Sequence, residues 1–190
     1  FHAAIGSPSY YTSITIDQPA KVAIGAARMG WWNAGGHMWS DANVAFIIGN
    51  NTLVSHFSIP GGIPSFSPHN ALREGKQRGL KLICMDPRRT EVARRADLHL
   101  QVRPGHDAAV LASMIRLILE ENLHDAAFCA EHVTGLDELF AQLAPFTLEQ
   151  VAAAAGISAA QIAEAARLFA AGPRGTAVTA MDKPRTIHDF

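Results

Sequence analysis

Three short apolar runs, each closed by polar or turn-forming residues, limit the fold of this chain more than any other feature. They cover residues 44–48, 80–85 and 98–102. A continuous apolar run of this length is typical of a strand buried in a parallel sheet. Open sheets of that kind bind ligands at the carboxyl ends of their strands. The three polar closures therefore predict one ligand-binding edge.

Helical patterns fill the segments between and after these runs. The expected helices cover residues 68–78, 88–95, 107–121, 124–132, 136–143, 151–155 and 158–171, and a last strand covers 176–180. Alternation of strand and helix predicts an α/β fold with a doubly wound, Rossmann-like, mostly parallel sheet and a helical C-terminal part. We expect one domain over residues 1–175, with strands and helices to about 122 and a helical segment over about 123–172, and the start of a further segment at 176–190.

Composition excludes several classes of function. The chain has 190 residues, a formal charge of -1 and two cysteines, with 48% hydrophobic residues. A charge this close to zero gives no electrostatic case for nucleic acid, and the absence of an 18-residue apolar run excludes a membrane span. Because the sequence begins at Phe1 rather than Met, we expect a piece of a longer protein. The compartment stays open between cytoplasm and periplasm, since an export signal would precede Phe1.

The first two strand ends carry side chains and backbone suited to a nucleotide. Gly49 and Asn50 follow the first run and let the backbone approach a pyrophosphate closely, although on this motif alone an ordinary strand-to-loop turn is the favoured explanation. Asp86 follows the second run and can accept a hydrogen bond from a ribose hydroxyl. Its alternative is a helix N-cap with Pro87 in the first turn.

The third strand end adds a further acidic residue. Asp107 favours the start of a helix, and its carboxylate also suits a guanine edge. Arg88 and Arg89 face either a phosphate or water. No Gly-x-Gly-x-x-Gly follows the first run and no Gly-Lys-Ser/Thr is present, which argues against an ordinary NAD site and a P-loop. The residues alone thus favour a nucleotide-containing ligand of unknown identity.

Two motifs resemble one enzyme family. They are Asp86-Pro87-Arg88-Arg89-Thr90 and Arg103-Pro104-Gly105-His106-Asp107. With Gly49-Asn50 and Ser55-His56 upstream, and over roughly residues 11–181, the chain is similar to the catalytic subunits of molybdopterin oxidoreductases, the dimethyl sulfoxide reductase and formate dehydrogenase group. That family holds molybdenum or tungsten between two molybdopterin guanine dinucleotides.

The resemblance implies a division of roles among the strand ends. Gly49, Asn50, Asn51, Ser55 and His56 would line the pyrophosphate and pterin side of one dinucleotide. Asp86 and the residues after it (Pro87, Arg88, Arg89 and Thr90) would meet the guanosine, and Gly105, His106 and Asp107 would read the guanine. The full-length protein would catalyse two-electron or oxygen-atom transfer on a small-molecule substrate. We expect the stretch of residues 1–190 alone to be inactive.

The metal ligand and the partners are further implications of the resemblance. Asp17 occupies the place where members of the family supply a metal-binding side chain, and it is the catalytic and metal-ligand candidate; its alternative is a helix N-cap. An iron–sulfur cluster before Phe1, an iron–sulfur electron-transfer subunit and the remaining domains of the polypeptide are the implied partners. Two other functions stay open: a non-catalytic nucleotide-binding module of the same fold, and an unrelated doubly wound nucleotide-dependent enzyme.

Overall fold

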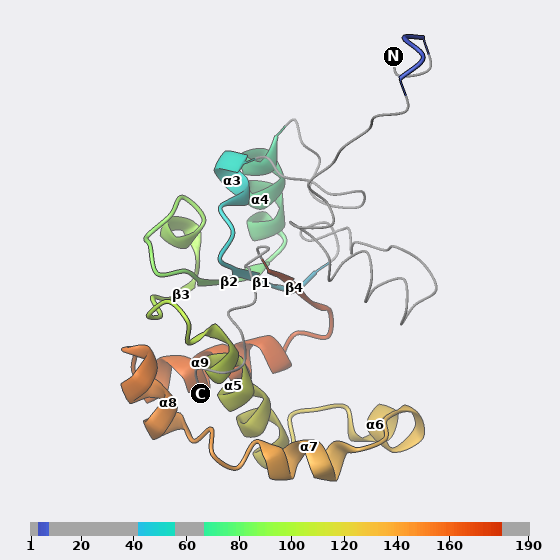
Figure 1. The fold of residues 1–190 in the computed structure, drawn as a ribbon, viewed down its shortest axis with the longest axis vertical. Helices are drawn as coiled ribbons and strands as arrows, with labels where there is room; N and C mark the ends of the chain where they lie inside the picture. Colours follow the sequence, from blue (N-terminus) through green and yellow to red (C-terminus); the bar gives the residue numbers. More distant parts are fainter. Residues whose placement is uncertain (1–3, 8–41, 56–66, 180–190) are drawn as a thin grey trace.

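Four parallel strands form the sheet in the computed structural model, which describes residues 4–7, 42–55 and 67–179. The spatial order is β3-β2-β1-β4, with β1 at Val44–Ile48, β2 at Lys81–Met85, β3 at Leu98–Leu100 and β4 at Gly175–Thr179. Each of the expected strands is present, and the prediction of an α/β fold with a parallel sheet and a helical C-terminal part is confirmed (Figure 1).

Helices cover both faces of the sheet, as a doubly wound fold requires (Figure 1). Helices α3 (Thr52–Ser55) and α4 (Pro68–Gln77) lie on one face, and α5 (Asp107–Glu120), α8 (Leu148–Ala155) and α9 (Ala159–Ala170) on the other. All five residues of β1 are buried. Since side chains alternate along a strand, Val44, Phe46 and Ile48 join the core against α5, α8 and α9, whereas Ala45 and Ile47 join the core against α4.

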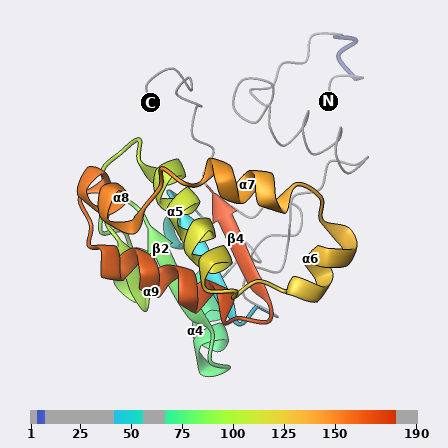
Figure 2. The same cartoon turned by 90° about the horizontal axis from the view of Figure 1, so that it is seen from below.

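Local sequence signals fix where several helices begin and end. Ser158 and Gln161 form a complete capping box at the start of α9, and Thr147 caps α8 by accepting from the Gln150 amide. Gly156 ends α8 in the left-handed conformation, with φ of 72°. Helices α6 (Ala126–His132) and α7 (Leu136–Gln142) complete the helical part; α7 lies near one end of α5, and α6 lies farther out (Figures 1 and 2).

One local prediction is wrong. The helix expected at 88–95 is reduced to a single 3-10 turn, η2, at Ala93–Arg95. Asp86 therefore caps no helix, and its Oδ1 instead accepts from the Arg88 amide two residues later, which makes an Asx-type turn. The segment after β1 contains the short helix α3. Within the described ranges, no helix is long and apolar enough to cross a membrane.

Candidate functional site

The carboxyl ends of three adjacent strands lie level with one another. Ile48 pairs with Met85, and Met85 pairs with Leu100, so the residues that follow are Gly49, Asp86 and Gln101 at one edge. Strand β1 also lies between β2 and β4, which the chain reaches by opposite sides of the sheet. A topological switch point of this kind opens a crevice at the strand ends, where α/β proteins bind ligands.

The turn after β1 presents backbone amides at this edge. Gly49 has φ of 58°, in the region that favours glycine, and its N–H donates to the Met85 carbonyl at 2.8 Å. The Gly49 amide is thus used by the sheet. Among the described residues, the amides of Asn50 and Asn51 have no backbone acceptor. These two N–H groups are the donors that the turn can offer to a ligand.

The Asn51 side chain is fixed by a residue from the neighbouring loop. Its Nδ2 donates to Glu91 Oε2 at 2.7 Å, and this bond lowers the pKa of the Glu91 carboxyl. Asn51 Oδ1 and the Thr52 hydroxyl are buried, and neither has a partner within the described part of the chain. A buried polar atom without a partner is costly, so this corner has hydrogen-bonding capacity that the described protein groups leave unused.

Asp86 lies almost fully buried at the end of β2, 3% exposed. Its Oδ1 accepts from the Arg88 amide at 2.8 Å, and the exposed Arg88 guanidinium stands 3.9 Å away. The backbone of the same turn is held from β3. His99 Nε2 lies 2.9 Å from the Asp86 carbonyl and must donate to it, because a carbonyl only accepts.

Residues 103–106 form a tight turn after β3. The His106 amide donates to the Arg103 carbonyl at 3.3 Å, and Gly105 has φ of 90°. Pro at the second position and a positive-φ Gly at the third are the pattern of a type II turn. Helix α5 begins directly afterwards at Asp107, whose carboxylate favours the helix dipole.

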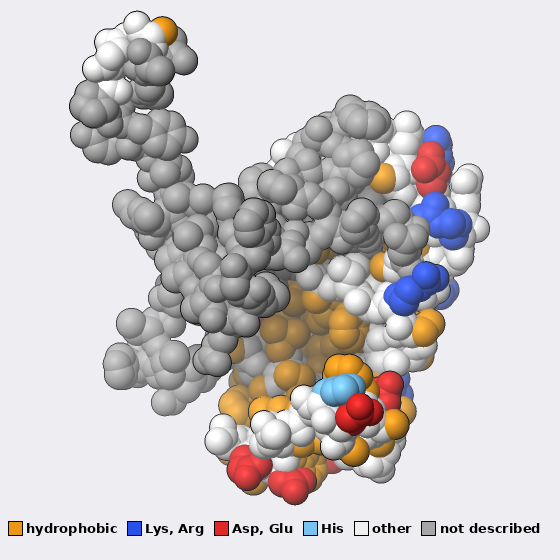
Figure 3. Space-filling model, turned by 90° about the vertical axis from the view of Figure 1, so that its right-hand side faces the viewer, with side chains coloured by type: hydrophobic (Ala, Val, Ile, Leu, Met, Phe, Trp, Pro, Cys, Tyr) orange, Lys and Arg blue, Asp and Glu red, His pale blue; other side chains and the backbone are white. Residues whose placement is uncertain are grey.

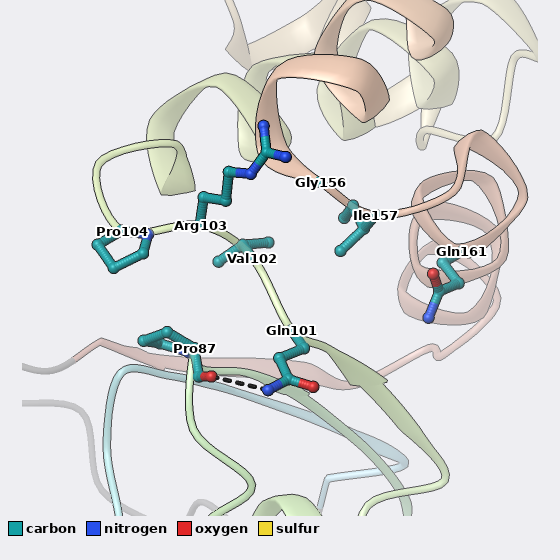
Figure 4. A pocket seen from close by; sticks show the side chains of 8 residues that line it. All are labelled: Pro87, Gln101, Val102, Arg103, Pro104, Gly156, Ile157 and Gln161. Carbon is teal, nitrogen blue, oxygen red and sulfur yellow. Dashed lines mark hydrogen bonds between the residues drawn. The ribbon is translucent and has the colours of Figure 1, made fainter.

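A cavity of about 520 Å³ opens between the ends of β2 and β3 and the α8–α9 junction (Figure 4). Pro87 and Gln101 line its sheet side, where Gln101 Nε2 donates to the Pro87 carbonyl at 3.0 Å. Gly156 and Gln161 line its helical side. The wall therefore offers backbone, two side-chain amides and apolar surface, a mixture suited to a flat polar group.

Arg103 joins the turn after β3 to the helical side of this cavity. Its backbone N–H donates to the Ala155 carbonyl at 2.9 Å, and its Nη1 donates to the Ala154 carbonyl at 3.2 Å. These carbonyls are at the C-terminal end of α8, where the last turn of a helix lacks its own donors. The arginine of this motif thus caps α8 and fixes the cavity wall.

The structure brings some predicted site residues to this edge and assigns others to local roles. Pro87 lines the cavity, with Asp86 next to it in the chain. Arg103 and Pro104 also line it, whereas Gly105, His106 and Asp107 are not among its lining residues. Arg89 is exposed, whereas Thr90 is buried and its hydroxyl accepts from the Ala93 amide at 3.2 Å. Ser55 is exposed at the end of α3. Asp17 and His56 lie outside the described residues.

Among the cavity residues that the sequence interpretation missed are two glutamines, Gln101 and Gln161. Gln101 directly follows β3, so its position at a strand end was a usable signal. Gln161 comes from the start of α9, and only the fold brings it to the same cavity. Within the described residues, no group of three or more His, Cys, Asp or Glu side chains is arranged to hold a metal ion.

The comparisons with known proteins agree on one family. Residues 4–182 match the family described as molybdopterin oxidoreductase. The chain is 38% identical over 132 residues to acetylene hydratase from Syntrophotalea acetylenica, and 35% identical over 130 residues to formate dehydrogenase H from Escherichia coli. The first match covers 70% and the second 68% of this chain, but each covers 17% of its relative.

A solved structure gives the same result for the fold. The acetylene hydratase from Pelobacter acetylenicus superposes with a TM-score of 0.71 at 31% identity. The superposition covers 92% of this chain and 23% of the hydratase. The chain thus corresponds to less than a quarter of that larger protein.

Proposed function

Because the chain belongs to the molybdopterin oxidoreductase family, we propose that it is the domain that holds one molybdopterin guanine dinucleotide of a molybdenum or tungsten oxidoreductase. The observation that carries the proposal is the position of Asp86, a buried carboxylate at the level edge of three parallel strands, beside the cavity lined by Pro87 and Gln101. Strand ends at a switch point are where nucleotides bind in such folds.

The guanosine end of the cofactor fits the side of the edge near β2 and β3. Asp86 is preorganised, because the Arg88 amide fixes its Oδ1 and β3 fixes its backbone. A carboxylate can accept several hydrogen bonds, so it retains capacity for a ribose hydroxyl or a base N–H. The cavity beside it accommodates a flat base, and the Asp107 carboxylate at the start of α5 would read the guanine edge.

The phosphate and pterin end fits the side of the edge near β1. The amides of Asn50 and Asn51 point to a role in holding the pyrophosphate, since backbone N–H groups suit anionic oxygens. Gly49 contributes the positive-φ turn rather than a hydrogen bond, because its own amide bonds to Met85. Asn51 Oδ1, buried and without a described partner, fits an N–H donor of the ligand.

When bound, the cofactor supplies the two-electron or oxygen-atom transfer of the full-length enzyme. The residues of this chain bind and orient it and exclude water from its nucleotide. Asp17 remains the candidate for the metal ligand. We propose that the remaining polypeptide completes the substrate site and the second dinucleotide site, that iron–sulfur groups relay the electrons, and that residues 1–190 alone are inactive.

The test is the ligand and metal content of the purified full-length protein. We expect mass spectrometry of the released ligand to identify a molybdopterin guanine dinucleotide, and elemental analysis to find molybdenum or tungsten. The dinucleotide without either metal would indicate a non-catalytic module. A different nucleotide would indicate an unrelated enzyme, and either result would reject the proposal.

The role of Asp86 is tested by Asp86→Asn, which keeps the shape and removes the charge. Hydrogen bonds to a charged group contribute about 1.5–3 kcal/mol, so cofactor affinity should fall by roughly tenfold or more. Glu74→Gln is the matched control, since Glu74 is exposed on α4. Equal cofactor retention in both variants would reject the assignment of Asp86.

A further inference from the structure

Large apolar side chains are exposed along one stretch of the chain. The described residues contain eight exposed large hydrophobic side chains, and six of them lie between positions 115 and 140. These six are Ile115, Leu123, Phe128, Val133, Leu139 and Phe140, and we refer to them as the α5–α7 face. Single exposed apolar residues are common, but six within one stretch indicate a surface that another protein segment covers.

Two of the helices that carry this face, α6 and α7, bury none of their own side chains. Phe128 in α6 is 56% exposed. Amphipathic helices of soluble proteins normally bury an apolar stripe. Figure 3 shows this side of the molecule, where hydrophobic side chains cover much of the lower lobe and line the hollow above it. The apolar surface is therefore broad rather than a set of isolated side chains.

The charges on the α6–α7 part of this face have one sign, whereas Arg116 stands next to Ile115 on α5. Residues 123–142 contain four acidic residues and no Lys or Arg. The four are Asp125, Glu131, Asp137 and Glu138, and all of them are exposed. A complementary surface would be apolar with basic residues at its rim, because like charges facing each other are unfavourable.

The comparisons indicate where such a surface is found. The match to the hydratase structure covers 92% of this chain but 23% of that chain, so in the hydratase a domain of this kind belongs to a much longer polypeptide. We propose that the α5–α7 face is the docking surface for the remaining part of the same polypeptide, through an apolar patch with a basic rim. In Figure 1 the helices α5, α6 and α7 lie below the sheet, whereas α3, which follows the turn after β1, lies above it, so this role is additional to cofactor binding.

Photo-cross-linking of the full-length holoprotein tests this proposal. The photoreactive residue p-benzoyl-phenylalanine is placed at position 140 on α7, and position 73, which is exposed on α4, serves as the background control. We expect the main product at position 140 to join it to a peptide of the same polypeptide outside residues 1–190. Cross-linking to a second copy or to another protein, or a yield no higher than at position 73, would overturn the proposal.

A charge-reversed variant tests the chemistry of the contact. Asp137→Lys combined with Glu138→Lys should reduce the yield of the cross-link from position 140, because the basic rim would then face basic side chains. Gln142→Lys, on the same helix but not at an acidic position, is the control for added charge alone. An equal yield in the charge-reversed variant and in this control would show that the surface facing α7 is not basic.

Discussion

The Arg103 side chain lies against the turn at Gly156, where an added Cβ would stand 2.9 Å from the arginine Nε. The arginine is held there by its bonds to the α8 carbonyls and has little freedom to move away. Gly156 is therefore constrained twice, by its φ of 72° and by the guanidinium beside it. The contact joins the turn after β3 to the α8–α9 junction, the two borders of the cavity.

We predict that Gly156→Ala lowers the free energy of unfolding by more than backbone strain at a positive φ would lower it alone. Strain at a left-handed position costs about 1–2 kcal/mol. Gly135→Ala is the matched control, because Gly135 has φ of 79° and its added Cβ would meet only Glu138 Oε2 at 3.8 Å. When Arg103 is also replaced by Ala, the unfolding free energy lost through Gly156→Ala should fall to the amount lost through Gly135→Ala. Chemical denaturation of the four variants measures this coupling, and additive effects would contradict it.

Gly105 is constrained by its conformation alone. Its φ is 90°, yet an added Cβ would meet no atom within 4 Å. Gly105→Ala should therefore cost about 1–2 kcal/mol of unfolding free energy, and Gly105→Asn less, since Asn tolerates positive φ better. His106→Ala should be nearly neutral, because His106 makes no side-chain cap. Equal stability of the Ala and Asn variants would mean that the turn relaxes.

The strands and the helices of the C-terminal part were predictable because their signals are local. Continuous apolar runs gave β1 and β2, and Ser158-Gln161 gave the start of α9. The helix at 88–95 failed for a physical reason. Asp86 and Pro87 have the pattern of a helix start, but the Asp86 carboxylate is buried against the Arg88 amide in a turn at the sheet edge. Tertiary burial overrode local propensity.

The candidate site was predictable only in part. Asp86 and the turn at Gly105 follow strands directly, so their neighbourhood could be inferred from the order of elements. Gln161 could not be, because it is 60 residues from Gln101 in the chain and only the packing of α9 brings it to the cavity. Arg103 was grouped with a ligand-binding motif, whereas its hydrogen bonds are to the end of α8.

Cys84 should resist alkylation in the folded protein. Burial, with a smaller effect from the nearby Asp86 charge, raises the pKa of its thiol to about 12. The thiolate is the reactive form, so iodoacetamide at mildly alkaline pH should modify Cys129, which is partly exposed, and leave Cys84 intact. Peptide mass spectrometry after native labelling measures this, and labelling after denaturation is the control. Equal modification of both cysteines would show that β2 opens readily.

The same thiol makes a prediction about stability at high pH. The folded pKa is raised above the ordinary value of 9.0, so the folded state keeps its proton where the unfolded state loses it. The contribution of this thiol to the free energy of unfolding is then fully present below pH 9.0 and is lost as the pH rises toward about 12. In denaturation measurements, the free energy of unfolding of the Cys84→Ser variant should fall less steeply over this pH range than that of the unmodified protein. An identical slope in the two proteins would assign the loss to other groups.

The bond between Asn51 and Glu91 should make the turn after β1 sensitive to acid. The Asn51 amide lowers the pKa of the Glu91 carboxyl in the folded protein. The bond therefore stabilises the folded state at pH values above the unfolded pKa of about 4.3, and this stabilisation is lost as the pH falls through the lower, folded pKa. Glu91→Ala should release the Asn51 side chain and reduce cofactor retention at neutral pH. Glu74→Ala, on α4, is the control for loss of an exposed carboxylate. Retention in the Glu91 variant equal to that control would show that Asn51 does not need this partner.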